Sequence, residues 1–143
     1  MSNNFNVQHY IELMSKKNLN EIEERQLSSY KASVESQITY NRKEEYLLLI
    51  KKYLAGKIDP HTFRADFLTM QKQDTEALEI MEKNLEQLSS FSIDFGLKEE
   101  KFLHLIDLTY DSSILAFELG PEEGISDQAF QVSIENAFLK FRE

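Results

Sequence analysis

Acidic side chains are the residues that this sequence offers for chemistry. One segment spaces three carboxylates and a histidine at intervals of four, three and four residues: Glu100, His104, Asp107 and Asp111. On a helix these residues share one face, and such a face could bind a metal ion. Ferritin-like diiron proteins, however, use a Glu-x-x-His motif on two helices, and no Glu stands three residues before any of the three His of this chain. We therefore interpret the set as a solvated acidic face and expect no metal and no cofactor.

A second acidic row lies upstream and comprises Glu76, Glu79, Glu82 and Glu86. The last three recur at i, i+3 and i+7, so one helix would place them on one face. Like charges at this spacing cost a helix roughly a few tenths of a kcal/mol per pair, which a solvated face tolerates. The functional alternative is a docking surface that offers carboxylates to Lys and Arg of a partner. The residues that we predict to bind such a partner are these four and, next, Asp107, Asp111, Glu122 and Glu123.

Charge is distributed unevenly along the 143 residues, which carry a formal net charge of −9. Residues 1–58 hold 9 Lys and Arg against 7 Asp and Glu, whereas residues 59–143 hold 7 against 18. Binding to nucleic acid depends on cations that neutralise phosphates, so the acidic part should avoid nucleic acid and attract a cationic protein. The alternative is that acidity only aids solubility. We expect a cationic protein partner and no direct contact with nucleic acid or membrane.

The sequence has no cysteine, which excludes disulfides, thiolate metal sites and cysteine nucleophiles and fits the cytoplasm or another reducing compartment. The N-terminus lacks a charged region followed by an apolar run, and nowhere do 18 apolar residues follow one another, so we predict neither a signal peptide nor a membrane span. With three His and no Gly-rich phosphate loop, the chain offers little for catalysis. We expect a non-enzymatic protein. An enzyme is the third possibility, with the face that begins at Glu100 as its only candidate site.

Only 4 Gly and 2 Pro occur, so long helices and an all-α fold are predicted. A short accessory helix is expected at about 7–17. Asn20 then provides an N-cap, with Glu23 three residues later, for one long helix or two. A break or kink is expected at 39–42, because the β-branched Thr39 and Asn41 have low helix propensity.

The stretch YLAGKIDPHTF, residues 53–63, predicts a sharp corner between two helices. Gly56 suits the left-handed conformation that closes a helix. Asp59 suits the N-cap of the next helix and Pro60 its first turn. That next helix is expected to continue to about 89.

Two further helices complete the expected fold, one at about 97–119 and a last one that begins at Ser126 or Asp127. Four major helices with short connections predict an antiparallel four-helix bundle. We expect this acidic bundle to occupy residues 44–143 and an additional N-terminal helical extension to occupy residues 1–43.

Two stretches, YLLLIKKYLAGKIDPHTFRADFL and GISDQAFQVSIENAFLKF, resemble the colicin D immunity-like family of bacterial self-protection proteins. The residues that match the family pattern are Tyr53, Leu54, Gly56, Lys57, Ile58, Phe63 and Phe67 at the corner, and Ile125, Ser126, Asp127 and Phe130 at the last helix. The resemblance covers about 44–143. It implies a small four-helix bundle that blocks a basic nuclease toxin, tRNA-cleaving in the best-known case, by presenting acidic side chains to its active-site cleft.

The alternative is a helical assembly or structural subunit that docks onto a larger protein complex through its N-terminal helices, with residues 19–53 as the docking arm. The long helix at the start of the chain, most of which lies outside the resemblance, motivates this hypothesis. Its Tyr and Leu positions suit an interface, because Tyr offers a large and rigid contact area. The identity of the partner and the oligomeric state are left open by the sequence.

Overall fold

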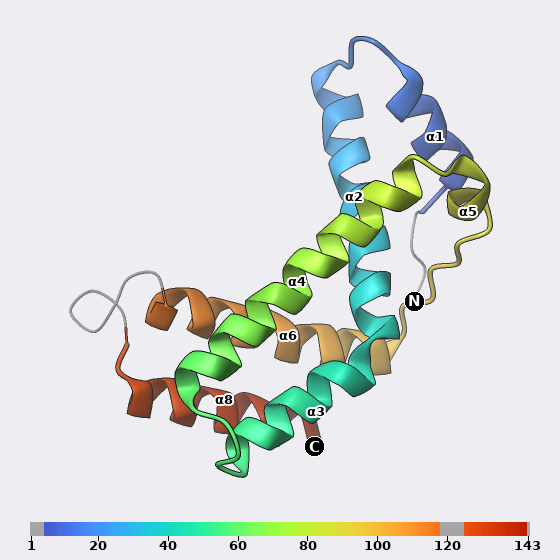
Figure 1. Ribbon diagram of the computed structural model, residues 1–143. Coiled ribbons are helices and arrows are strands. Elements are labelled where there is room, and N and C mark those ends of the chain that lie inside the picture. The colour runs from blue at the N-terminus through green and yellow to red at the C-terminus, as the bar shows by residue number, and fades with distance from the viewer. Residues whose placement is uncertain (1–4, 118–124, 143) are drawn as a thin grey trace.

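The computed structural model describes residues 5–117 and 125–142 and contains seven helices and no strand in those residues. The helices are α1 (Val7–Ser15), α2 (Glu21–Asn41), α3 (Lys43–Leu54), α4 (Pro60–Glu82), α5 (Leu85–Ser89), α6 (Leu97–Phe117) and α8 (Asp127–Arg142) (Figure 1). The predicted all-α class is therefore confirmed. Within the described residues, each helix is too short or too polar to cross a lipid bilayer. The end of the predicted 97–119 helix lies outside the described residues.

Side-chain caps begin α2 and α4 where the sequence predicts them. The Asn20 side chain accepts a hydrogen bond from the backbone N–H of Glu23 (2.8 Å), and the Glu23 carboxylate accepts one from the N–H of Asn20 (3.1 Å), which is a complete capping box. At α4, the Asp59 carboxylate accepts a hydrogen bond from the N–H of Thr62 (2.6 Å), and Pro60 occupies the first turn. Both caps satisfy amide groups that the first turn of a helix leaves without partners.

The corner between α3 and α4 depends on Gly56, which has a positive φ of 76°. The N–H of Gly56 donates to the carbonyl of Tyr53 (3.0 Å), and the N–H of Lys57 donates to the carbonyl of Lys52 (2.9 Å). This pair of hydrogen bonds is the Schellman motif, which closes a helix through one left-handed residue. The predicted end of the helix is confirmed.

The predicted single helix over 60–89 is wrong, because the chain leaves the helical path after α4 and begins again at α5. The Asn84 side chain accepts a hydrogen bond from the backbone N–H three residues later (3.1 Å) and so caps a new helix. Asn competes with the helix backbone in this way, which is why it favours caps over helix interiors. As a consequence Glu86 lies on a different helix from Glu79 and Glu82, and the three residues do not form one helix face.

The last helix, α8, is capped by Ser126, whose hydroxyl accepts a hydrogen bond from the N–H of Ala129 (3.1 Å). Its first turn is joined to α4 by an ion pair between Arg64 and Asp127 (3.1 Å). The Arg64 guanidinium also lies over the Phe130 ring, 5.1 Å from its centroid. Because Arg64 is buried, this contact fixes the start of α8 against α4.

Two hydrophobic clusters make up the core, and α4 contributes to both. The larger cluster joins α3, the first half of α4, α6 and α8 around large buried rings: Tyr46, Tyr53, Phe63, Phe67, Phe102 and Phe130. The smaller cluster joins α1, α2, the second half of α4 and α5: Tyr10, Leu13, Tyr30, Val34, Leu78, Met81 and Leu88. The smaller cluster therefore contains residues from both the predicted N-terminal extension, 1–43, and the predicted bundle, 44–143.

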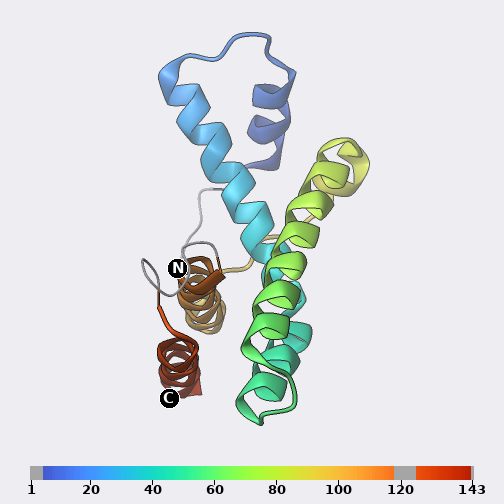
Figure 2. The ribbon, with the colours of Figure 1, turned by 60° about the vertical axis from the view of Figure 1, so that its left-hand side comes forward.

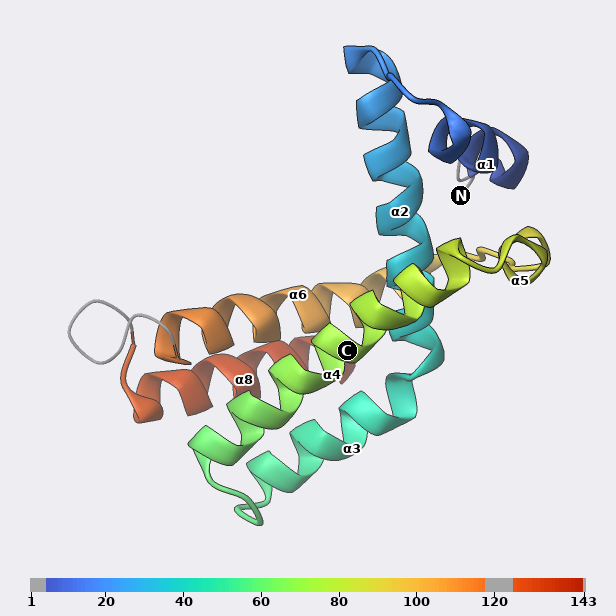
Figure 3. The same ribbon diagram turned by 45° about the horizontal axis from the view of Figure 1, so that its top comes forward.

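The long helix α4 runs diagonally across the molecule and links the two clusters (Figure 1). Helices α6 and α8 pack against each other and are seen nearly end-on in Figure 2. Helix α2 extends away from α3 and α6, and α1 packs against it (Figure 3). This arrangement leaves α2, α4 and α6 in mutual contact at the middle of the molecule.

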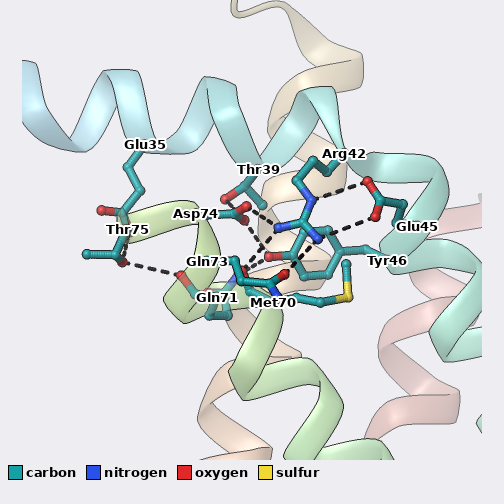
Figure 4. Close-up of polar contacts among 10 residues, drawn as sticks. All are labelled: Glu35, Thr39, Arg42, Glu45, Tyr46, Met70, Gln71, Gln73, Asp74 and Thr75. Carbon is teal, nitrogen blue, oxygen red and sulfur yellow. Dashed lines mark hydrogen bonds and ion pairs between the residues drawn. The ribbon is translucent and has the colours of Figure 1, made fainter. Parts of the chain in front are cut away.

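A buried carboxylate fixes the bend between α2 and α3, which occurs at Arg42 inside the predicted 39–42 segment (Figure 4). Asp74 on α4 is 1% exposed and accepts hydrogen bonds from Thr39 (2.8 Å), Arg42 (2.7 Å) and Tyr46 (2.5 Å). Burial and the bond to Asp74 raise the pKa of Tyr46, so its hydroxyl remains a donor. The predicted break is confirmed, and its cause is this contact with α4 as well as local propensity.

Gly56→Ala should lower the free energy of unfolding by about 1 kcal/mol, because Ala is strained at a positive φ. Chemical denaturation measures this change. Gly96→Ala is the control, since Gly96 does not have a positive φ; a methyl group there would lie 3.1 Å from Glu99 Oε1, which accepts the Gly96 N–H and would have to shift by a few tenths of an ångström. Equal destabilisation by the two substitutions would contradict the role given to Gly56.

Arg42→Met should lower the free energy of unfolding by about 3 kcal/mol, because it leaves the buried Asp74 carboxylate without a cation. The control is Glu45→Gln. Glu45 provides the other carboxylate that is paired with Arg42, and its side chain is 64% exposed. We expect this control to change stability by less than about 0.5 kcal/mol. Similar losses in the two variants, measured by urea denaturation, would refute the role of the buried pair.

Candidate functional site

The structure gathers several of the predicted carboxylates in one groove between α2, α4 and α6. The groove has a volume of about 600 Å³. Four acidic side chains line it: Glu35, Glu79, Glu82 and Asp107. Three of these were predicted to bind a partner, and they come from positions up to 28 residues apart in the sequence. Glu35 is an addition that the sequence reasoning missed.

The packing of the three helices explains why these side chains meet. Glu79 and Glu82 are one helical turn apart on α4, and Leu78, which also lines the groove, is a buried residue of the smaller hydrophobic cluster. Asp107 follows the buried Ile106 on α6. Glu35 similarly follows the buried Val34 on α2. Each carboxylate therefore lies at the edge of an apolar stripe that packs inward.

A second cavity of about 500 Å³ continues the groove along α4 and α6. It shares Glu35 and Asp107 with the first cavity. Its other end is lined by apolar and aromatic side chains: Leu68, Tyr110 and Ile114. The groove is consequently acidic in its middle and more apolar toward the end of α6.

Glu82 is already engaged inside the chain. Its carboxylate accepts a hydrogen bond from the Tyr10 hydroxyl (2.6 Å) and lies 3.5 Å from the Lys31 ammonium. The Glu82 side chain is only 17% exposed. Burial, followed by the bond to Glu82, raises the pKa of Tyr10, so the hydroxyl stays protonated as a donor. These contacts tie α1 and α2 to α4 and form one wall of the groove.

Glu79 and Asp107 form no ion pair within the described residues. Glu35 accepts only a long hydrogen bond from Thr75 (3.3 Å). Although Asp107 is exposed as a whole residue, partial burial of its carboxyl group raises its pKa, and the negative charge of Asp111 raises it further. His104 acts in the opposite direction. A carboxylate that is partly buried and lies near another negative charge is stabilised by a bound cation, which compensates for the lost hydration.

The remaining predicted partner-binding residues are distributed elsewhere. Glu76, Glu86 and Asp111 are exposed but do not line the groove. Glu122 and Glu123 lie outside the described residues. Among the residues that the structure describes, no group of three or more His, Asp or Glu side chains is placed to hold a metal ion. Glu100 and Asp111 are separated by about 16 Å along the axis of α6, at 1.5 Å per residue.

Comparison of the chain with protein-family models, with curated proteins and with solved structures gave no match. The resemblance to the colicin D immunity-like family therefore rests on the matching residues at the corner and at the last helix.

Asp107→Asn should raise the thermal midpoint at neutral pH and leave it unchanged in acid. Because the folded-state pKa of Asp107 lies above its usual value, the fold favours the neutral carboxyl, and stability is lost as pH rises through that pKa. The amide removes this loss. Thermal unfolding at neutral pH and below the usual Asp pKa of 3.8 measures the difference.

The control is Asp66→Asn, which neutralises an exposed carboxylate on the same protein. We expect it to raise the neutral-pH midpoint by less than Asp107→Asn does. A neutral-pH midpoint for Asp107→Asn below that of the unaltered protein would contradict the assigned environment of Asp107.

Proposed function

We propose that the protein is a non-enzymatic binding protein that receives a cationic segment of another protein in the groove between α2, α4 and α6. The observation that carries this proposal is the convergence of Glu35, Glu79 and Asp107, from three separate helices, on one groove. None of the three is neutralised by an ion pair in the described part of the chain. Lys or Arg side chains of a partner would supply the missing counter-charge.

Charge acts on association at two distances. The net charge of −9 attracts a cationic partner from beyond contact and increases the association rate. Inside the groove, the partly buried Asp107 carboxyl group would exchange a poorly hydrated environment for a hydrogen-bonded cation. Lys31 and Lys72 at the groove walls limit the number of cations that it can take.

The apolar end of the groove indicates which kind of partner segment would fit. Leu68, Tyr110 and Ile114 can cover an aliphatic or aromatic side chain, while the acidic middle pairs with cations. Tyr110 is 42% exposed and offers a large apolar surface with a polar tip. A segment that carries Lys or Arg together with a large apolar residue, as an amphipathic helix does, suits both parts.

As the class of partner we propose a basic nuclease domain, tRNA-cleaving in type, that this protein inhibits in the cytoplasm as a bacteriocin immunity protein does. The resemblance of the corner and the last helix supports this choice, as does the acidic sign of the groove. A basic cleft that has evolved to bind phosphates would accept a row of carboxylates and lose access to RNA. We propose further that α3, α4, α6 and α8 form the antiparallel four-helix bundle of this class.

A helical assembly subunit is the second candidate function. One observation favours it: Ile22, near the start of α2, is 74% exposed on the part of the molecule that extends away from α3 and α6 (Figure 3). An exposed large aliphatic side chain at such a position suits an interface. In this case the N-terminal helices, and not the acidic groove, would contact the partner.

The test uses two synthetic helical peptides, one with Lys on one face and Leu on the other and one with Glu in place of Lys. The Lys peptide should bind, and Glu79→Gln/Asp107→Asn should weaken its binding about tenfold by removing two groove charges. The matched control, Glu76→Gln/Glu86→Gln, removes the same charge outside the groove and should change affinity by less than about twofold. Isothermal titration calorimetry measures the affinities.

Association of the Lys peptide should slow about tenfold or more between roughly 50 and 500 mM salt, because the Debye length falls well below 10 Å. Equal effects of the groove and control pairs would refute the groove as the site. For the proposed class of partner, the protein should stop tRNA cleavage by its cognate basic nuclease, and the groove pair should weaken this inhibition. If Glu79→Gln/Asp107→Asn inhibits the nuclease fully and Ile22→Ser does not, the N-terminal helices contact the partner and the groove does not.

A further inference from the structure

A separate pocket of opposite charge lies between α6 and α8. It has a volume of about 260 Å³. Six residues line it: Lys101, His104, Leu105, Ala137, Lys140 and Phe141. None of them lines the acidic groove, and no carboxylate is among them. The pocket is therefore a distinct site, and it is basic within a chain that is acidic overall.

The floor of the pocket is apolar and firmly packed. Leu105 is 1% exposed and Ala137 is 5% exposed. The Phe141 ring packs edge-on against Phe102, with 6.1 Å between the ring centroids, and also contacts the Phe138 ring at 6.4 Å. Because Phe102 and Phe138 belong to the larger hydrophobic cluster and Phe141 packs against it, the floor is preformed and a ligand would not have to order it.

The rim of the pocket carries cationic side chains. Lys101 and Lys140 form no ion pair with any described residue. Lys101 and His104 are one turn apart on α6, and Lys140 faces them from the last turn of α8. His104 also interacts electrostatically with Asp107, its neighbour toward the acidic groove. Two ammonium groups beside an apolar floor suit a ligand with one anionic end and one apolar body.

Size and net charge restrict the ligand further. The volume lies below the roughly 300–1,000 Å³ of sites for drug-sized molecules, so it fits a body of about one aromatic or aliphatic side chain. A large acidic partner would be repelled by the net charge of −9, whereas a single negative charge is repelled little. The pocket therefore favours a small ligand with one charge.

We propose that the pocket between α6 and α8 binds a small apolar carboxylate, with its body on Leu105, Ala137 and Phe141 and its carboxylate between Lys101 and Lys140. Such a group occurs both in free aromatic or branched carboxylic acids and at the C-terminal residue of a peptide. The ligand chemistry is the same for the two sources. This binding is independent of the cationic partner proposed for the acidic groove.

The experiment is an NMR titration of the ¹⁵N-labelled protein with phenylacetate and with its neutral isostere phenylacetamide. Phenylacetate should shift the amide signals of Lys101, His104 and Phe141 with a Kd in the low millimolar range, as expected for a ligand of this size. Phenylacetamide should bind about fivefold more weakly. Lys101→Gln/Lys140→Gln should weaken phenylacetate binding by about the same factor.

Two control pairs make the result specific. Lys51→Gln/Lys52→Gln removes two exposed cations on α3 and should leave phenylacetate binding unchanged. Glu35→Gln/Glu79→Gln, which neutralises two groove carboxylates away from His104, should also leave it unchanged, so a failure of this proposal is separable from a failure of the acidic groove. The proposal is overturned by equal binding of acid and amide, by shifts centred away from α6 and α8, or by the absence of saturable shifts.

N-acetyl-Gly-Phe, with a free carboxylate, distinguishes the two sources of the ligand. If it binds more tightly than phenylacetate, the pocket accepts the end of a peptide chain, because the added backbone makes further contacts. If it binds more weakly, the pocket accepts a free carboxylic acid, because the longer chain does not fit. Either result supports the carboxylate site, provided that the Lys101→Gln/Lys140→Gln pair weakens the tighter ligand.

Discussion

The buried carboxylate of Asp74 sets a condition that the rest of the molecule has to meet. A charge with 1% exposure is stable only where donors and a cation surround it, and Thr39, Arg42 and Tyr46 supply them from α2, the bend and α3. Helices α2 and α3 must therefore meet α4 at one point and at one angle. The bend at Arg42 exists in this form because both of its sides are bonded to the same carboxylate (Figure 4).

This point of contact determines where the functional surfaces lie. Since α2 crosses α4 beside Asp74 and continues to the smaller hydrophobic cluster, a groove remains between α2, α4 and α6. Acidic residues that flank the packed stripes of the three helices gather there, and Glu79 and Asp107 form no ion pair with the residues that the structure describes. Their mutual repulsion costs stability, and a cationic partner would relieve it.

Helix α6 separates two surfaces of opposite charge. Its Asp107 faces the acidic groove, whereas Lys101, on another side of the same helix, faces the pocket against α8, and His104 lines that pocket at the edge nearer to Asp107. The two surfaces meet where His104 interacts electrostatically with Asp107. A single helix can hold both surfaces because Lys101 and Asp107 are six residues apart, which places them about 120° apart around the helix axis at 3.6 residues per turn.

The sequence was sufficient to predict most of the helix caps, but it was not sufficient to predict which helices pack against one another. Asn20, Gly56, Asp59 and Ser126 act within one helical turn, so the sequence by itself determined most helix ends and the all-α class. Asn84 caps a helix in the same way, but we did not predict this cap. Because α5 begins there, Glu86 does not continue the predicted row of carboxylates on α4. Only the tertiary structure decided that Glu35 joins Glu79 and Asp107, because periodicity identifies the buried face of each helix but not the helix that it meets.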